Sequence, residues 1–349
     1  MISNFYGNAE AVRTLTEMLS SNRIPQTILL AGPSGIGKAT LVRRFAAELL
    51  RLNEADAQKI ERDDLYLSAN QELLAEREKL PAEKRNEDPF YLATYPDFVT
   101  FGPDGPLRQI SIPQMRLLKD QAQLQPMRGS RRVFLIDQID RANEQAANSL
   151  LKVLEEPPPH LVIFMTADNP YDLLTTIRSR SVMIRMNRLT EGDISTFVDS
   201  MGLDQPARRA RLANGSPGAA ASIDLEAFDK RRAAMLTLLE VASRRAQFGS
   251  WLKNAESISA SKTEKLEYYL EILFLLLEDI LLIAHGFNEI RNPDLKPQLQ
   301  AIAAAVDFHW LRRAVHLTSE MNRLLRRNIQ KGIALDAYAI ELRDMVPAL

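Results

Sequence analysis

The sequence contains no cysteine, and it holds only 14 glycines and 18 prolines in 349 residues. Without cysteine, the chain can form neither a disulfide framework nor a zinc site with cysteine ligands. The ordinary glycine and proline content argues against collagen-like and low-complexity classes. A chain without disulfides suits a reducing compartment, so we expect a cytoplasmic protein that holds no zinc.

An excess of charge is also missing, because 45 acidic residues balance 44 lysines and arginines to a formal net charge of −1. Aromatic residues make up only 7% of the chain, and they form no basic and aromatic stripe of the kind that single-strand binders use. The short basic clusters are typical of solvated helix faces. We therefore expect no strong independent DNA binding, and any DNA contact would be shared with partners.

No uninterrupted hydrophobic run is long enough for a membrane span. The most apolar stretch, Tyr268 to Ala284, is broken by Glu271, Glu278 and Asp279, whereas a spanning helix needs roughly 20 apolar residues. This stretch is expected to be a buried helix. The first residues lack the basic and apolar pattern of a signal peptide, so no export is expected.

Short apolar runs in the first half predict a parallel sheet covered by helices. Thr27–Ala31, Val133–Ile136 and Leu161–Met165 read as buried strands, and a helix is expected from about Lys38 to Leu50. After about Arg188 the pattern becomes helical throughout. The predicted fold class is an α/β domain followed by a small helical lid and an all-helical C-terminal domain.

The length predicts more than one domain. We expect the α/β domain at residues 1–188, with a charged helical insertion at about 53–88. The lid is expected at 189–223 and the C-terminal helical domain at 224–349.

A phosphate-binding loop of the form G-x-x-x-x-G-K lies between the first predicted strand and the helix after it. Its residues are Gly32, Pro33, Ser34, Gly35, Ile36, Gly37 and Lys38. The glycines let backbone N–H groups turn toward phosphate oxygens, and the lysine adds a full charge. The next residue is Ala39, where Ser or Thr normally offers a hydroxyl to Mg²⁺, and Thr40 lies one position further along the helix. We predict ATP or ADP binding with weak or absent Mg²⁺; the alternative is a loop retained for its turn geometry alone.

The second predicted strand ends in Asp137, followed by Gln138. This resembles a Walker B strand end, where a first acid holds Mg²⁺ and a second acid prepares the attacking water. An amide can orient water but cannot act as a general base at neutral pH. We therefore expect Asp137 at the nucleotide site and little hydrolysis.

Two further segments carry a specific resemblance, Ile-Ser-Ile-Pro-Gln-Met-Arg at 110–116 and Asn-Glu-Gln-Ala-Ala-Asn-Ser-Leu-Leu-Lys-Val-Leu-Glu-Glu-Pro-Pro at 143–158. Together with the phosphate loop, they resemble the delta-prime and gamma/tau subunits of the DNA polymerase III clamp loader, a family of AAA+ proteins. The resemblance covers about Phe5 to Ala221, and beyond it only the all-helical character matches. It implies an AAA+ fold and a helical collar domain.

The resemblance also implies roles for single residues. Ile177-Arg178-Ser179-Arg180-Ser181 is similar to the family's Ser-Arg-Cys motif, whose arginine reaches a neighbouring subunit's nucleotide as a finger; Arg180 matches that arginine, while Ser181 replaces the cysteine. Thr166 is the nearest match to the polar sensor at the end of the third strand. Motor subunits carry an arginine after a Gly-Ser in the lid, where this chain has Pro217.

These matches favour a stator of the delta-prime type over an ATP-hydrolysing gamma/tau-type motor, which is the alternative. A third possibility is a nucleotide-binding scaffold unrelated to replication. The implied partners are gamma/tau-type and delta-type subunits, the sliding clamp indirectly, and primer–template DNA within the assembly, with no membrane. Many relatives carry a four-cysteine zinc module where this chain has its charged insertion, so the insertion's contacts depart from the family pattern.

Overall fold

The computed structural model describes residues 2, 5–261, 264–324 and 330–347, which divide into two compact units, Met1–Ser222 and Ile223–Leu349. Each unit has its own core. Within the described residues, no helix combines the length and the apolar character that a bilayer span requires. The division of the first unit into an α/β domain and a lid remains a prediction.

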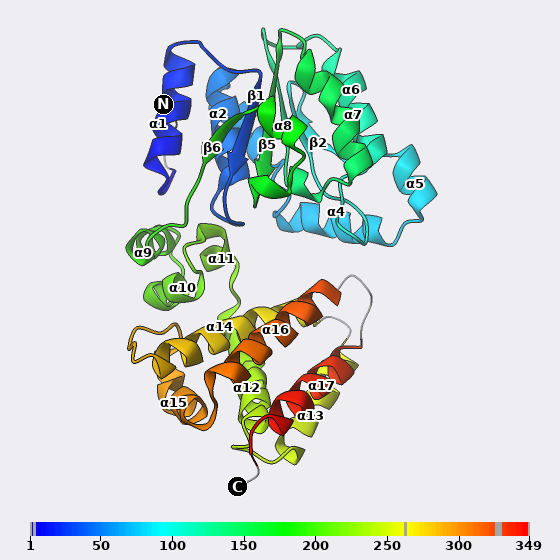
Figure 1. The fold of residues 1–349 in the computed structure, drawn as a ribbon. Coiled ribbons are helices and arrows are strands. Elements are labelled where there is room, and N and C mark those ends of the chain that lie inside the picture. The colour runs from blue at the N-terminus through cyan, green and yellow to red at the C-terminus, as the bar shows by residue number, and fades with distance from the viewer. Residues whose placement is uncertain (1, 3–4, 262–263, 325–329, 348–349) are drawn as a thin grey trace. The chain divides into compact units, whose positions relative to one another are not determined.

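A six-stranded sheet with the order β2-β3-β4-β5-β1-β6 forms the centre of unit 1 (Figure 1). Its strands are β1 (Thr27–Ala31), β2 (Leu92–Tyr95), β3 (Phe98–Phe101), β4 (Arg132–Ile136), β5 (Leu161–Ala167) and β6 (Val182–Arg185). Only β2 runs antiparallel to its neighbour, and the other pairs are parallel. The three predicted strands are β1, β4 and β5, which are buried along their whole length. The predicted α/β class with an all-helical C-terminal region is confirmed.

Helices cover both faces of this sheet (Figure 1). They are α1 (Ala9–Ser20), α2 (Lys38–Leu49), α6 (Ile112–Ala122), α7 (Glu144–Glu155) and α8 (Thr175–Ser179). The residues Leu15, Leu41 and Phe45 of α1 and α2 belong to the core of one face. Met115, Leu118 and Leu150 of α6 and α7 belong to the core of the other face. This burial of apolar helix stripes against the sheet stabilises the unit.

The charged segment at 53–88 forms the helices α3 (Glu54–Glu61), α4 (Ser68–Glu78) and α5 (Ala82–Glu87). Its Leu65 and Leu74 form a small apolar cluster with Phe90, which follows the segment. Figure 1 shows α4 along the edge of the sheet at which the parallel strands end. The remainder of unit 1 folds into α9 (Glu191–Ser200), α10 (Pro206–Leu212) and α11 (Pro217–Ser222).

Unit 2 is entirely helical within its described residues. It comprises α12 (Leu225–Ala242), α13 (Gly249–Ala260), α14 (Leu266–Ala284), α15 (Lys296–Ala305), α16 (Phe308–Leu324) and α17 (Lys331–Asp344). The apolar stretch at 268–284 lies in α14, whose Leu273 and Leu276 are fully buried. Two buried tryptophans anchor α17: Trp251 Nε1 donates to Asp336 Oδ1 at 2.6 Å, and Trp310 Nε1 donates to Leu342 O at 2.9 Å.

Candidate nucleotide site and arginine surface

The three central strands bring the predicted nucleotide-binding residues to one edge of the sheet. Because β4, β5 and β1 are adjacent and parallel, their carboxyl ends meet at the same edge. The phosphate loop follows β1, Asp137 follows β4, and Asp168 follows β5. Lys38 then begins α2.

The backbone of the phosphate loop adopts conformations that favour glycine. Gly32 and Gly35 have φ values of 156° and 72°, and a Cβ at Gly32 would lie 2.1 Å from the Met186 carbonyl oxygen. Ile36 is fully buried and fixes the middle of the loop to the core, whereas Ser34 is exposed at its rim. The loop thus has the turn geometry that a phosphate cradle needs.

Lys38 points into its own loop. Its Nζ donates to Gly32 O at 2.5 Å, to Pro33 O at 2.8 Å and to Asp168 Oδ1 at 2.8 Å, and the side chain is only 7% exposed. Asp168 was not predicted, although an acid directly after a buried strand is a recognisable sequence feature. A bound phosphate would compete with this carboxylate and with the two carbonyl oxygens for Lys38.

Asp137 is held from inside the sheet rather than from solvent. The Thr166 hydroxyl donates to Asp137 Oδ1 at 2.5 Å, and the Gln138 N–H donates to Thr166 Oγ1 at 2.8 Å. Burial raises the pKa of Asp137, while the Thr166 hydrogen bond opposes that shift. Thr166 itself is fully buried, so its hydroxyl positions the acid, and Asp168 is the residue of this strand end that faces the loop.

The structure offers Mg²⁺ few ligands near Asp137. Ala39 has no hydroxyl, and Thr40 Oγ1 accepts a bond from Arg43 Nη2 at 3.2 Å. Mg²⁺ prefers oxygen ligands in octahedral geometry, and the hydroxyl normally supplied by the loop is missing here. No group of three or more His, Asp or Glu side chains is arranged to hold a metal in the described ranges. The residues therefore fit a phosphate group better than they fit a Mg²⁺–phosphate complex.

The residues around the start of α11 contact the phosphate loop directly. The Gly218 N–H donates to Gly35 O at 2.9 Å, and a Cβ at Gly35 would lie 2.2 Å from Ser216 Oγ. Pro217 begins α11 and is buried, so it presents no charge to the loop. The start of α11 and the residue before it therefore pack directly on the phosphate loop.

Arg180 lies apart from the loop, at the C-terminal end of α8. Its Nη2 forms an ion pair with Glu155 Oε1 at 2.7 Å, and its Nη1 donates to Thr176 O at 3.1 Å. The arginine side chain is 34% exposed and the glutamate side chain 48%. Glu155 ends α7, in the Glu-Glu-Pro-Pro segment. The guanidinium is thus held near the surface by one half-exposed carboxylate.

Sequence reasoning also missed Tyr66, which the charged insertion brings to this edge of the sheet. Gln138 Nε2 donates to Tyr66 Oη at 2.7 Å. Although 63% of the residue is exposed, burial of its hydroxyl raises the pKa of Tyr66 to about 12, with Asp137, Asp168 and Asp64 adding to the shift and a bond with Ser34 opposing it. The exposed fraction is that of the whole Tyr66 residue, whereas its pKa depends on the surroundings of the hydroxyl group alone.

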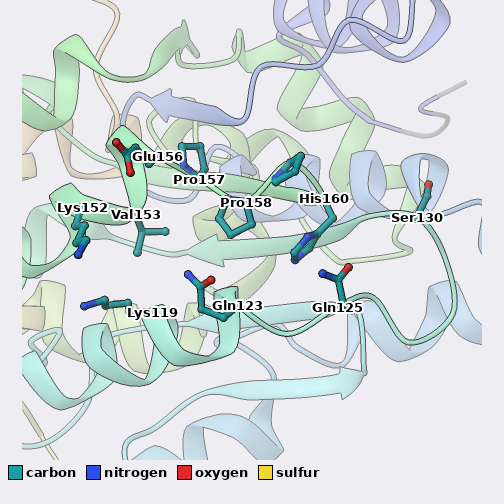
Figure 2. A pocket seen from close by; sticks show the side chains of 11 residues that line it. Lys119, Gln123, Gln125, Ser130, Lys152, Val153, Glu156, Pro157, Pro158 and His160 are labelled. Atoms are coloured by element: carbon teal, nitrogen blue, oxygen red, sulfur yellow. The ribbon is translucent and has the colours of Figure 1, made fainter.

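A cavity of about 760 Å³ lies elsewhere in unit 1. Figure 2 shows Lys119 of α6 and Gln123, which directly follows α6, opposite Lys152 and Val153 of α7, with His160 to their right. Because His160 directly precedes β5, the cavity lies at the amino ends of the strands. It is therefore separate from the phosphate loop, which follows the carboxyl end of β1.

Comparison with known proteins identifies two matching family models. Residues 7–190 match the model described as DNA polymerase III, delta subunit, and residues 226–342 match that described as DNA polymerase III, delta subunit, C terminal.

The individual proteins that the chain matches are also subunits of DNA polymerase III. The chain is 28% identical over 205 residues to the DNA polymerase III subunit delta' of Escherichia coli, covering 58% of this chain and 60% of that protein. It is 33% identical over 154 residues to the Pseudomonas aeruginosa subunit delta', covering 44% and 40%. Against the Haemophilus influenzae subunit tau/gamma it is 24% identical over 218 residues, covering 60% and 28%. Less than two thirds of each relative's length is therefore matched.

A solved structure shares the fold over almost the whole chain. The gamma subunit-related protein of Thermotoga maritima aligns with a TM-score of 0.52 and 16% identity, covering 96% of this chain and 99% of that one.

Proposed function

The chain belongs to the DNA polymerase III delta-subunit family, and from that membership we propose that it serves as a clamp-loader stator of the delta-prime type. In this role it contributes Arg180 to the nucleotide site of a neighbouring ATPase subunit. The observation that carries the proposal is the placement of Arg180, which one half-exposed ion pair holds near the surface of a chain whose own phosphate site is incomplete.

The chemistry of arginine suits such a role. A guanidinium is planar and permanently charged, and it can bind phosphate oxygens in a bidentate manner from across an interface. The guanidinium stabilises the negative charge that develops on the transferred phosphate in the transition state. This stabilisation is the source of the rate enhancement by arginine fingers. The exchange of Glu155 for a phosphate preserves an anionic partner for Arg180, and the Glu155 carboxylate that is released is 48% exposed and can be solvated by water.

The chain's own site argues against a motor. Ala39 removes the hydroxyl that would bind Mg²⁺, Gln138 stands in place of the second acid, and Pro217 replaces the lid arginine. The three departures affect metal binding, activation of water and sensing of phosphate, which are separate steps of hydrolysis. Arg180, by contrast, needs none of them, because it acts on a neighbour's nucleotide.

The proposed partners follow from the same family. We propose that the chain assembles with gamma/tau-type and delta-type subunits, that it acts on the sliding clamp through them, and that the assembly contacts primer–template DNA. Unit 2, which contains the segment that matches the C-terminal family model, is proposed to supply the helical collar of this assembly.

The finger is tested by ATP turnover in a complex reconstituted from this chain and motor subunits. Arg180→Ala should lower DNA-stimulated turnover by about 10³-fold at the neighbouring site, the lower end of the range for arginine fingers. Arg185→Ala is the matched control, because Arg185 is an exposed arginine on β6 that bonds to the Tyr171 hydroxyl. Unchanged turnover with Arg180→Ala would refute the assignment.

A motor of the gamma/tau type is the second candidate, and the uninterrupted loop from Gly32 to Lys38 favours it. Steady-state ATP hydrolysis by the purified chain, with and without primed DNA, separates the two. The stator proposal expects turnover at background. Magnesium-dependent turnover that Lys38→Ala abolishes would place the chain among the motors.

A further inference from the structure

The turn between α3 and α4 projects Tyr66 over the phosphate loop. Its hydroxyl lies between Gln138, which donates to it at 2.7 Å, and Ser34 at the rim of the loop. Gln138 occupies the position at which a second acid would prepare water for attack on the terminal phosphate of a nucleotide. Tyr66 therefore lies on the terminal-phosphate side of the site and not on the side of the base.

The residues before Tyr66 fix this turn to the body of unit 1. Asp64 accepts from Arg43 Nη2 at 2.5 Å and from the Tyr66 N–H at 3.0 Å. Arg43 is only 2% exposed, and its Nε also pairs with Glu61 Oε2 at 3.0 Å. A buried arginine with two carboxylate partners is a strong tie between α2 and the insertion.

A second tie is apolar. Leu65 is buried with Leu74 and Phe90, and a Cβ at Gly102 would lie 2.4 Å from Leu65 Cδ1, so β3 and the turn pack closely. Gln71 Nε2 donates to Leu65 O at 2.5 Å, and Asn70 Nδ2 donates to Asp64 O at 2.7 Å. Tyr66 thus extends from a turn that is anchored on both sides and hydrogen-bonded within.

Acidic side chains surround the same end of the site. Asp168 pairs with Lys38 at 2.8 Å, and Asp140 Oδ2 accepts from the Asp168 N–H at 3.3 Å. Asp137 lies beside them, and its charge is one cause of the raised pKa of Tyr66. Lys38 and Arg43 are the cations that act on Asp137, and both are already paired with carboxylates, Lys38 with Asp168 and Arg43 with the insertion. A third phosphate would add negative charge where carboxylates already outnumber these two cations.

We propose that Tyr66 and Asp168 close the terminal-phosphate end of the loop, so that the site selects a nucleoside diphosphate over a nucleoside triphosphate. The loop's backbone N–H groups remain the cradle for the first two phosphates. Tyr66 covers the space that a third phosphate would enter, and Asp168 repels its charge and competes for Lys38. The inference rests on the ATP or ADP binding that the loop's sequence predicts, and it adds the ligand class.

The test is a calorimetric titration of the purified chain with ADP and with ATP, each with and without Mg²⁺. The wild-type chain should bind ADP about tenfold or more tightly than ATP, which equals about 1.4 kcal/mol or more. Tyr66→Ala and Asp168→Asn should each bring the two affinities closer by raising that of ATP. Tyr66→Ala opens space and Asp168→Asn removes a charge. Because the two substitutions act by different means, the test still stands if one of the two variants fails to fold.

Tyr91→Ala is the matched control, since Tyr91 is another exposed tyrosine of unit 1 whose ring packs against Phe101. It should leave the ratio of affinities unchanged. The proposal is overturned if the wild-type chain binds ATP as tightly as ADP, if it binds neither, or if both variants retain the wild-type ratio. Each of these results leaves the Arg180 assignment intact, because that assignment concerns a nucleotide on a neighbouring subunit.

Discussion

The ion pair between Arg180 and Glu155 predicts that Glu155→Gln makes the arginine easier to recruit. In the chain alone, Nη2 and Oε1 lie 2.7 Å apart, with 34% and 48% of the two side chains exposed. Exposed and half-exposed pairs of this kind contribute about 0.2–1 kcal/mol. Removing the charge of Glu155 should therefore lower the free energy of unfolding by less than about 1 kcal/mol.

The same energy is what Arg180 must give up before it reaches a neighbour's phosphate. If about 0.5–1 kcal/mol of that cost is removed, turnover limited by the finger should rise about two- to fivefold. The assay is ATP turnover by the reconstituted complex, with Glu156→Gln as the matched control from the same segment. Glu155→Gln combined with Arg180→Ala should behave as Arg180→Ala alone. A fall in turnover with Glu155→Gln, toward the level of Arg180→Ala, would refute the reasoning and make Glu155 part of the working site.

Three stability predictions follow from unit 1. Arg43→Met should cost about 3 kcal/mol in urea denaturation, the lower end for a broken buried pair, because its carboxylate partners are partly exposed. Burial raises the pKa of Asp63 from 3.8 to about 6, so between these pH values the folded state binds more protons than the unfolded state. The free energy of unfolding of the wild-type protein should therefore fall by roughly 3 kcal/mol at most as the pH rises from 4 to 7. Asp63→Asn should lose this component, and parallel pH profiles for the two proteins would contradict it. Gly35→Ala should lower the melting temperature, because φ of 72° costs an alanine about 1–2 kcal/mol, whereas Gly129→Ala, with open space around its Cβ, should not.

The strands that the sequence revealed are those with continuous apolar runs. β1, β4 and β5 are buried on both faces, and their residues are apolar or small except for Arg132 at the start of β4. β6 was missed because it lies at the edge of the sheet and exposes most of its residues. β2 was missed for a similar reason, since its four residues are largely exposed and pair irregularly with β3.

The candidate site was predictable where neighbouring residues in the sequence form it. The loop at 32–38 carries its own pattern, and the acid after β4 follows a recognisable strand. The partners of these residues come from far along the chain and left no pattern. Asp168 reaches Lys38 across 130 positions, and Tyr66 reaches Gln138 across 72. Only the packing of the sheet and of the insertion brings these residues together.

The assignment of Thr166 as the polar sensor stays a prediction. Its position at the end of β5 suggested a polar sensor, but the alternation of side chains along a strand decides which way it points. In the fold its hydroxyl turns inward to Asp137, and the exposed end of the strand carries Asp168 instead.

The central claim is tested most directly by the structure of the assembled complex with a non-hydrolysable ATP analogue in the neighbouring subunit. The account predicts that Arg180 has left Glu155 and that its guanidinium lies about 2.7–2.9 Å from oxygens of the terminal phosphate, the range for charge-assisted hydrogen bonds. An Arg180 that remains paired with Glu155 while the neighbour's phosphate is contacted by another residue would contradict it.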